Sequence, residues 1–554
     1  CVAGRALGGL FSRGFSCVCC WLWEKYSLRG ARRLRVLVMM LIAYAGLLAV
    51  TGWRLTDTPT GFIPEQDQGF LIGVIQLQPG ASLARTDTVV TTAMNTLLET
   101  EGVDTLVALA GMNGATFSPA SNAGLMFIRL DSFEEREGQP GMSATALAGR
   151  LTGVINQAIP EGSGFIIAPP AVRGLGQGGG FKMMLQARDG RSFEELQQVA
   201  YAMMGAAAQE SRVSQVYTTF DTSSPRLRVD VDRERAFQLG VAPSEIYATL
   251  GTYLGSTYVN DFNFLGRTVR VTAQADAPFR DEAADVGQLQ VRSSSGEMVP
   301  LSAVARIIDD TGPVRVVRHN LFPAIELQGQ TPPGVSTGEA LAAMEELAAQ
   351  ILPEGVSYEW TEIAYQQKAA GNSGMIVFVF AVVFVFLVLA AQYEAFTLPW
   401  AVIFIVPMCV LAAMLGINLA GLDNNILTQV GLVVLIALAA KNAILLVEFS
   451  KQAEEKQGLT PSKAAVEGAR IRLRPILMTS FAFIFGVMPL AFAHGAGAEM
   501  RQAIGIAVFS GMIGVTLFGL LFTPVFYVIG RIISRLLPQG PSSDATDGSH
   551  GDQA

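Results

Sequence analysis

The sequence predicts a polytopic α-helical membrane protein that carries a large α+β insertion between its first and second spans. Half of its 554 residues are hydrophobic and only 16% are charged, whereas soluble domains usually carry about 25% charge. Six segments are apolar over about the 20 residues that cross a bilayer. Between the first two lies a long polar stretch in which strand-like and helix-like patterns alternate. These three observations favour a membrane protein over a soluble one.

The predicted spans are unevenly spaced, because the first stands alone and the other five, within 373–530, follow one another closely. Basic residues cluster before the first span (Lys25 to Arg35), between the fourth and fifth (Lys451 to Arg474) and after the sixth. Since cytoplasmic flanks are rich in Lys and Arg, we expect segments 1–35 and 531–554 in the cytoplasm and 54–372 on the opposite side. The spans run roughly over 36–53, 373–391, 399–419, 427–449, 475–493 and 503–530.

The insertion begins with one α+β unit within 54–175. A strand at 70–77 (FLIGVIQL) is followed by a Pro-Gly-Ala-Ser turn, in which Ser82 is placed to cap a helix that runs to about residue 99. Further strands and one helix complete a split β-α-β-β-α-β, or ferredoxin-like, unit. We expect these strands near 103–109, 124–130 and 163–168, and the helix near 142–157.

A second unit of the same kind is split between 176–222 and 313–372. Residues 223–312 interrupt it, so we expect a separate domain there. The strands are expected at 180–187, 213–219, 313–318, 323–329 and 356–360, and the helices at 193–209 and 336–350.

Composition disfavours several functions. The net charge of −8 argues against a nucleic-acid partner. No GxxxxGK[ST] phosphate loop is present, so ATP is not the evident energy source. The pairs Met183-Met184 and Met203-Met204 are interpreted as core packing, because no clustered cysteine or histidine accompanies them. We expect neither a metal nor an organic cofactor.

The two ends of the sequence carry expectations of their own. The first residue is Cys1 rather than Met, so we expect the sequence to be part of a longer chain. We expect the cytoplasmic tail 531–554 to be disordered, because its part after Leu537 is poor in apolar residues.

Lys441 is the most informative single residue, because it lies inside the apolar fourth span. A buried ammonium group there costs several kcal/mol unless it meets a counter-charge or water. Lys441 lies about ten residues from Lys451, or about 15 Å along a helix, which is too deep for easy snorkelling to the interface. The centres of the other spans contain no Asp or Glu. The carboxylate partner is therefore expected in a missing segment, unless Lys441 is neutral.

Arg472 and Thr479 lie seven residues apart at the start of the fifth span and share one face if that stretch is helical. Pro475 lies between them at a position suited to the first turn of a helix. Either residue could serve a functional site. The alternative for Arg472 is that it anchors the topology at the cytoplasmic end of the helix, and the alternative for Thr479 is a packing role.

Several motifs resemble those of the resistance–nodulation–division exporters, and most closely the hydrophobe and amphiphile pumps exemplified by the acriflavine-resistance pump. AKNAILLVE (440–448), RLRPILMTS (472–480) and FGVMPL (485–490) resemble the tenth and eleventh spans of that family. GFIPEQDQG (61–69), GSTYVNDF (255–262) and AAQYEAFTLP (390–399) also match, in the same order. The resemblance runs from about residue 25 to 535.

The resemblance implies that this chain is the C-terminal half of a twelve-span protein. Residues 54–175 resemble one periplasmic porter subdomain, 176–222 with 313–372 resemble the next, and 223–312 resemble the docking domain. Lys441, Arg472 and Thr479 stand at proton-relay positions, and the family's paired aspartates would lie in the absent half.

The resemblance also implies a substrate path. Val107 and Met112 stand in the family's switch-loop region, and Phe127 stands at a distal-pocket aromatic position. Phe181, Met183 and Leu185 match a strand of the family's proximal pocket. Tyr217 stands at a position of that pocket where an arginine can occur. Val107 and Met112 occupy positions that often hold phenylalanine, which puts the drug range in doubt.

By resemblance, the expected activity is drug/proton antiport driven by the proton-motive force, so the protein is a secondary active transporter and not an enzyme. Small amphipathic organic compounds would be exported from the bacterial inner membrane by a homotrimer. A periplasmic adaptor, an outer-membrane channel and the lipid bilayer are the implied partners. The alternatives are a heavy-metal efflux pump, a protein-translocation auxiliary and an inactive gene fragment.

Overall fold

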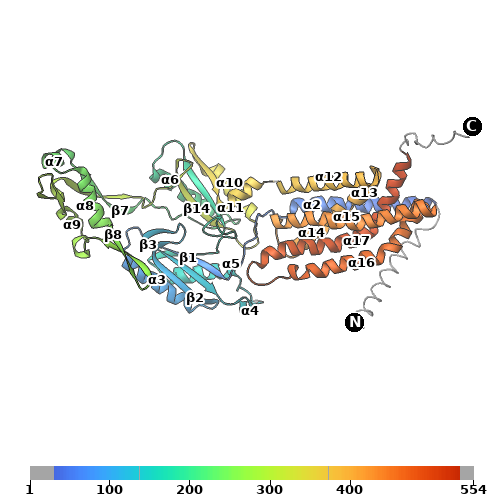
Figure 1. Cartoon of the computed structure of the whole chain (residues 1–554), viewed down its shortest axis with the longest axis horizontal. Coiled ribbons are helices and arrows are strands. Elements are labelled where there is room, and N and C mark those ends of the chain that lie inside the picture. Colours follow the sequence, from blue (N-terminus) through green and yellow to red (C-terminus); the bar gives the residue numbers. More distant parts are fainter. Residues whose placement is uncertain (1–29, 137, 372, 537–554) are drawn as a thin grey trace, which may run out of the picture.

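The computed structural model describes residues 30–136, 138–371 and 373–536 and shows an elongated molecule (Figure 1). A bundle of long helices forms one end, two α+β subdomains form the middle, and a small distal domain forms the other end. Helix α2 begins and helix α17 ends at the side of the bundle that points away from the insertion. This arrangement agrees with an insertion that leaves the membrane on one side only.

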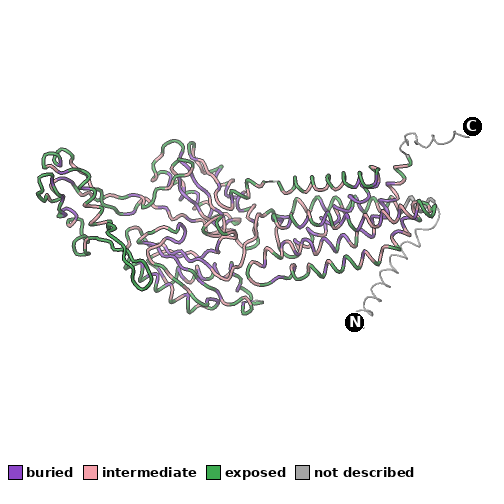
Figure 2. The backbone as a smooth tube through the Cα atoms, viewed as in Figure 1, coloured by how far each residue is buried: buried purple, intermediate pink, exposed green. Residues whose placement is uncertain are grey.

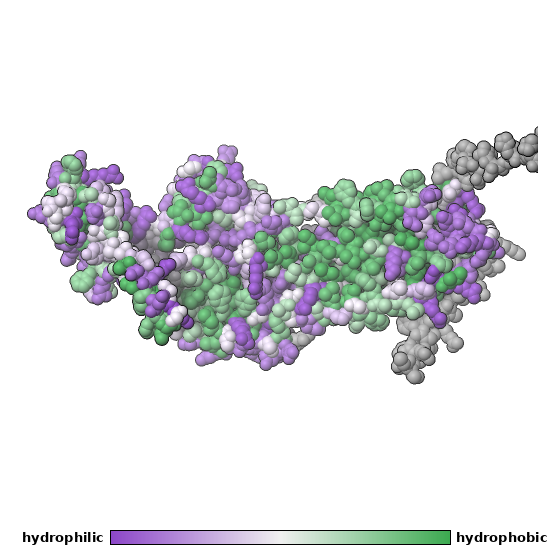
Figure 3. Space-filling view, in the orientation of Figure 1, coloured by the Kyte–Doolittle hydropathy of each residue, from purple (hydrophilic) through white to green (hydrophobic). Residues whose placement is uncertain are grey.

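In the described part of the chain, six helical segments are long and apolar enough to cross a membrane. Figure 3 shows the resulting band of hydrophobic surface along the bundle. The third segment is a pair of helices that breaks between Ile403 and Val406. The segments are formed by α2 (Gly30–Asp57), α12 (Ser373–Tyr393), α13 (Thr397–Ile403) with α14 (Val406–Leu419), α15 (Ile426–Gln457), α16 (Pro461–Ala491) and α17 (Ala498–Leu536). The six predicted spans are confirmed.

Helices α14, α15 and α17 form the interior of the bundle (Figure 2). Small residues allow their backbones to approach closely: a Cβ atom added at Gly511 would collide with Leu435, and one added at Gly514 would collide with Ala412. In contrast, α12 and α16 expose large apolar side chains such as Phe380 and Phe485. These exposed faces suit contact with lipid or with another protein segment.

Two boundary predictions are wrong. The fifth span does not begin at Pro475, because α16 starts at Pro461 behind Thr460, and Pro475 lies inside the helix. The basic stretch 461–474 is also helical, so the helix extends beyond the apolar part of the span. The segment expected to be a disordered tail from residue 531 begins as helix, because Arg531 and Arg535 both pair with Glu454 of α15. The rest of that tail, and most of segment 1–35, lie outside the described residues.

The first subdomain is a four-stranded antiparallel sheet with two helices on one face. The strand order β2-β3-β1-β4 is that of the split β-α-β-β-α-β fold. Ser82 caps α3 as predicted, accepting a hydrogen bond from the backbone N–H of Arg85. The elements are β1 (Phe70–Leu77), α3 (Leu83–Leu98), β2 (Val103–Asn113), β3 (Ser118–Leu130), α4 (Phe133–Arg136), α5 (Ala144–Ala158) and β4 (Gly162–Ile167).

The second subdomain repeats this topology with the strand order β6-β14-β5-β15. Short β13 pairs with β14, and the strand expected over 313–318 is wrong, since only its last residue belongs to β13. The elements are β5 (Phe181–Ala187), α6 (Phe193–Ala207), β6 (Ser214–Tyr217), β13 (Arg318–His319), β14 (Phe322–Gln330), α10 (Thr337–Ile351), β15 (Val356–Thr361) and α11 (Glu362–Ala370).

A distal domain interrupts the second subdomain. Strands β7 (Ser224–Val231) and β12 (Ala305–Gly312) pair antiparallel and carry the chain out and back. Its small core contains Ile246, Val291 and Leu301. The remaining elements are α7 (Arg233–Gln238), α8 (Pro243–Gly255), β8 (Thr257–Phe264), β9 (Arg267–Ala273), the 3-10 turns Ala277–Phe279 and Leu301–Ala303, α9 (Ala283–Gln288), β10 (Gln290–Arg292) and β11 (Met298–Pro300).

A short junction after α2 ties the membrane bundle to both subdomains. Thr60 forms a parallel bridge with Asn424, and the N–H of Ile426, the first residue of α15, donates to the carbonyl of Phe62. The carbonyl of Thr60 accepts from the N–H of Gly338 in α10, 3.2 Å away. A Cβ atom at Gly338 would collide with this carbonyl. The second subdomain therefore rests directly on the segment that leads from the bundle.

The motif GFIPEQDQG has a structural role at the same level. The Asp67 carboxylate accepts two hydrogen bonds from the Arg136 guanidinium, at 2.7 and 3.2 Å, and one from the N–H of Ala144 at the start of α5. The backbone carbonyl of Asp67 accepts a hydrogen bond from the N–H of Gly497, just before α17. One aspartate thus links the first subdomain to the last membrane helix.

Candidate functional site

The membrane part of the candidate site centres on Lys441, at the middle of the 32-residue helix α15. Its side chain is exposed on the bundle surface, while the next residue, Asn442, is buried. Among the described residues, no ion pair joins Lys441 to a carboxylate. The position is therefore a lysine midway along an apolar helix, with its side chain facing outward from this chain.

Thr479 lies at the same depth on the neighbouring helix α16. The amide of Asn442 donates to the hydroxyl of Ser480 over 3.3 Å, which places these two turns opposite each other. Thr479, one residue earlier, is exposed, and its hydroxyl donates to the carbonyl of Ile476. Lys441 and Thr479 are therefore brought to one level of the bundle.

Arg472 lies two turns away from that level, which is about 10 Å along the helix. Its guanidinium carbon stacks 3.5 Å from the ring centre of Phe449 on α15. Its buried Nε has no hydrogen-bond partner among the described residues. The structure does not bring Arg472 to Lys441, and its relay role stays a prediction.

The second part of the candidate site is a cleft between the two subdomains. The faces of the two sheets that carry no helices meet where Phe165 of β4 stacks on Tyr217 of β6, with ring centres 4.8 Å apart. Beside this contact lies a cavity of about 170 Å³. Its lining includes Gln76, Asn113, Thr116, Ser118, Asp221 and Arg315.

The loop between β2 and β3 forms one wall of this cleft. The Asn113 side chain accepts hydrogen bonds from the N–H groups of Ala115 and Thr116 and donates to Gln76. Phe117 follows in a left-handed conformation with φ of 50°. The predicted switch-loop region, 107–117, covers the end of β2 and this loop. The Asn113 side chain organises the loop through hydrogen bonds from the loop backbone.

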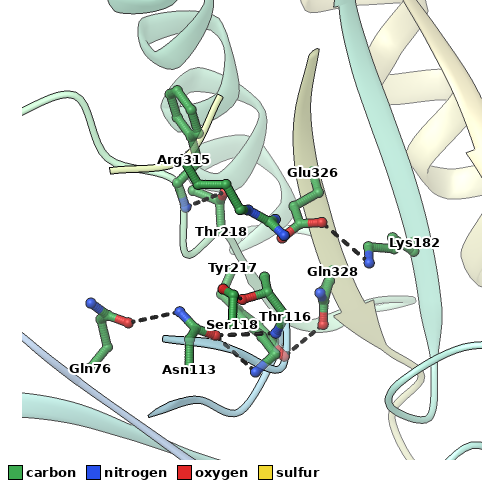
Figure 4. A network of polar contacts seen from close by, with 12 residues as sticks. Gln76, Asn113, Thr116, Ser118, Lys182, Tyr217, Thr218, Arg315, Glu326 and Gln328 are labelled. Atoms are coloured by element: carbon green, nitrogen blue, oxygen red, sulfur yellow. Dashed lines mark hydrogen bonds and ion pairs between the residues drawn. The ribbon is translucent and has the colours of Figure 1, made fainter. Parts of the chain in front are cut away.

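Arg315, from the segment between β12 and β13, lines the opposite side of the cavity and joins a charge network with residues of the second sheet (Figure 4). Glu326 of β14 is nearly buried and contacts Lys182 at 3.2 Å and Arg315 at 2.9 Å. Lys182 also contacts Glu362 at 3.1 Å. Burial alone would lower the pKa of Lys182, but the Glu326 and Glu362 carboxylates outweigh it and raise that pKa. This charge network is complete within the chain.

Tyr217 lies at the centre of the cleft. Its hydroxyl donates to the side-chain carbonyl of Gln328 at 2.9 Å. Burial, together with the Glu326 and Glu362 carboxylates, raises the pKa of this hydroxyl, so it stays protonated and remains a donor. The arginine that the family resemblance suggests here is replaced by an uncharged, hydrogen-bonded ring.

The predicted substrate-contacting residues of the first subdomain lie on the helix-free face of its sheet. Val107 of β2 pairs with Phe127 of β3, and both side chains are more than a third exposed. Phe117 lies near Phe127, with ring centres 6.5 Å apart. Met112 packs against the interface cluster that includes Tyr217. These positions suit a path along the cleft.

The three predicted residues of the second subdomain lie elsewhere. Phe181, Met183 and Leu185 point to the helix-covered face of the sheet, where they pack against α6 and α10. Met183 and Leu185 are fully buried. Core packing accounts for them in this conformation, and contact with a substrate stays a prediction.

Sequence reasoning missed Arg315, Glu326 and Lys182. Arg315 lies in a segment that was expected to be a strand. The available signal was a charge within an apolar strand, Lys182 in FKMMLQA and Glu326 in FPAIELQ. Such charges are buried only when paired, but the sequence does not show which residues form the pair.

A six-span helical bundle with two ferredoxin-like subdomains and a distal domain on one side defines a multi-pass membrane protein with the fold of the resistance–nodulation–division transporters. The chain belongs to the AcrB/AcrD/AcrF family, whose sequence pattern matches residues 3–531.

Named relatives have similar sequences. The multidrug/solvent efflux pump membrane transporter MepB of Pseudomonas putida is 39% identical over 514 residues, which are 93% of this chain and 48% of that protein. The multidrug export protein AcrF of Escherichia coli K12 is 39% identical over 493 residues, which are 89% of this chain and 47% of AcrF. The multidrug resistance protein MdtF of the same organism is also 39% identical, over 497 residues. The chain thus spans about half the length of these relatives.

Proposed function

We propose that the chain is the C-terminal half of a proton-driven exporter of amphipathic organic compounds. In this proposal the complete protein is the inner-membrane subunit of a tripartite pump. It forms a homotrimer and works with a periplasmic adaptor and an outer-membrane channel. The names of its relatives, which are multidrug and solvent efflux proteins, support this class of cargo.

The observation that carries the proposal is the outward-facing Lys441. A charged side chain at mid-membrane depth is costly unless a counter-charge or water meets it. Among the described residues no carboxylate pairs with it, so the missing half would supply one. Protonation of that carboxylate would release the lysine, and deprotonation would bind it again. The two arrangements form a switch that a proton gradient biases.

The cleft between the subdomains is the proposed substrate path. Val107, Met112 and Phe127 would supply apolar and aromatic contacts, and the amides and hydroxyls near Asn113 would supply hydrogen bonds. Small-molecule sites commonly combine an apolar lining with a few placed polar groups. In the proposed cycle, movement of α15 reaches the second subdomain through the Thr60–Gly338 contact.

The test uses the complete transporter in an efflux-deficient host. Lys441→Ala is expected to abolish drug resistance while expression and trimer formation stay largely intact. Lys451→Ala, ten residues further along α15 and beside the Tyr393 ring, is the control and is expected to retain resistance. Full activity of Lys441→Ala would contradict the proposal.

A further inference from the structure

In the described part of the chain, the cleft between the two subdomains presents a guanidinium with unused hydrogen-bond donors, that of Arg315. Arg315 lines the cavity, and 43% of its side-chain surface is exposed. Among the residues that the structure describes, its guanidinium donates one hydrogen bond, from Nη2 to Glu326. A guanidinium carries five N–H donors in a planar fork, so donors remain on the side of the cavity.

The carboxylates nearby are already occupied. Glu326 shares its two oxygens between Lys182 and Arg315 and is only 6% exposed. Asp221, on the cavity lining, accepts hydrogen bonds from the backbone N–H and hydroxyl of Ser223 and from the hydroxyl of Ser224. Both carboxylates therefore already have hydrogen-bond donors within the chain, and that of Glu326 is also paired with two cations.

The size of the cavity limits what it holds. Sites for whole drug-sized molecules have volumes of about 300–1,000 Å³, whereas this cavity has about 170 Å³. It therefore suits the polar head of a larger molecule whose apolar body lies along the exposed face near Phe127. A carboxylate is a head group that a guanidinium fork binds through two parallel hydrogen bonds.

We propose that Arg315 is a specificity-determining residue of the cleft and binds the carboxylate of acidic or zwitterionic amphipathic substrates. This inference rests on the proposed export function and narrows its substrate class. It predicts that the transporter distinguishes an acid from its own ester. An ester keeps the apolar body and loses only the anionic head.

The experiment measures binding of two matched dyes to the complete transporter in lipid nanodiscs by fluorescence polarisation. Rhodamine 19 carries a free carboxylate, and rhodamine 6G is its ethyl ester. Wild type is expected to bind the acid more tightly than the ester. Arg315→Gln is expected to weaken binding of the acid about tenfold, the scale of one charge-assisted hydrogen bond, and to leave the ester unchanged.

Two further variants keep the test decisive. Arg188→Gln, at an arginine of similar exposure that pairs with Glu359 outside the cavity lining, is expected to change neither affinity. Glu326→Gln frees the guanidinium and is expected to strengthen binding of the acid. Equal affinities for both dyes, or equal losses in Arg315→Gln, would overturn the inference alone. Absence of binding of either dye to wild type would overturn the inference and the proposed function together.

Discussion

Two lysines in apolar segments show how differently the insertion and the membrane bundle handle charge. Lys182 lies in a strand of the second subdomain with 13% of its side chain exposed, between Glu326 and Glu362. Lys441 lies in a membrane helix, and its exposed side chain has no carboxylate partner among the described residues. The insertion completes its charge network within the chain, whereas the bundle presents an unpaired cation on its surface. The first arrangement is structural, and the second suits a switch.

The largest expected effect on stability is that of Lys182→Ala. Removing one partner of a buried ion pair costs up to about 3–5 kcal/mol, and the Glu326 carboxylate would stay buried with Arg315 as its remaining partner. Hydrogen exchange in β5 and β14 is expected to accelerate strongly. Lys441→Ala is the matched comparison and is expected to leave exchange in α15 nearly unchanged. A similar acceleration of hydrogen exchange in both variants would contradict the distinction between the two regions.

Gly338→Ala tests the contact through which the two regions meet. The added Cβ would collide with the Thr60 carbonyl, and overpacking of this kind costs about 1–3 kcal/mol. The expected result is lower thermal stability of the second subdomain and reduced export in the complete transporter. Gly153→Ala, at a helical glycine of α5 with open space around it, is the control. It is expected to be neutral or stabilising by up to about 1 kcal/mol.

Glu65→Gln tests whether the junction responds to pH. Glu65 and Asp423 line one cavity of about 450 Å³ between the bundle and the subdomains. Burial raises the pKa of the Glu65 carboxyl, although the hydroxyl of Thr331 donates to it at 3.0 Å and opposes the shift. A carboxyl with a raised folded pKa stabilises the fold fully below its unfolded pKa and loses that contribution as pH rises through the folded value.

The variant is therefore expected to unfold at a higher temperature than wild type at pH 8 and at a similar temperature at pH 4. Thermal unfolding of both proteins across this range checks the sign. A variant that is less stable than wild type at pH 8 would show that the charged form of Glu65 is the favoured one.

Phe127→Ala is expected to have the smallest effect on stability and a selective effect on transport. The side chain is 36% exposed, so the cost in unfolding free energy is expected to stay near or below about 1 kcal/mol. Resistance to some drugs is expected to change several-fold while resistance to others is retained. Leu125→Ala, on the same face of β3 but 1% exposed, is the control for a packing defect. Uniform loss of resistance with reduced protein in Phe127→Ala would indicate a folding role.

Sequence patterns predicted the elements that are determined by residues close together in the sequence. Strand β1, the Ser82 cap and the six spans follow from hydrophobic period and from short capping motifs. Pro475 was misplaced because a membrane helix tolerates an internal proline. Residues 313–318 were predicted to be a strand, although Val314 and Arg315 line the cleft instead. The Lys182–Glu326–Arg315 network joins residues far apart in sequence, so no local pattern identifies it. Lys441 was identified from sequence, because a cation in an apolar span stands out without any knowledge of its partner.

The most direct test of this account is whether Lys441 needs a partner from outside the chain. Residues 1–554 are expressed in an efflux-deficient host, alone and together with the proposed N-terminal half, each with Lys441 or with Lys441→Ala. Drug resistance is expected only when both halves are present and Lys441 is intact. Resistance from residues 1–554 alone would contradict the account, because a relay without its carboxylates would then be sufficient for export.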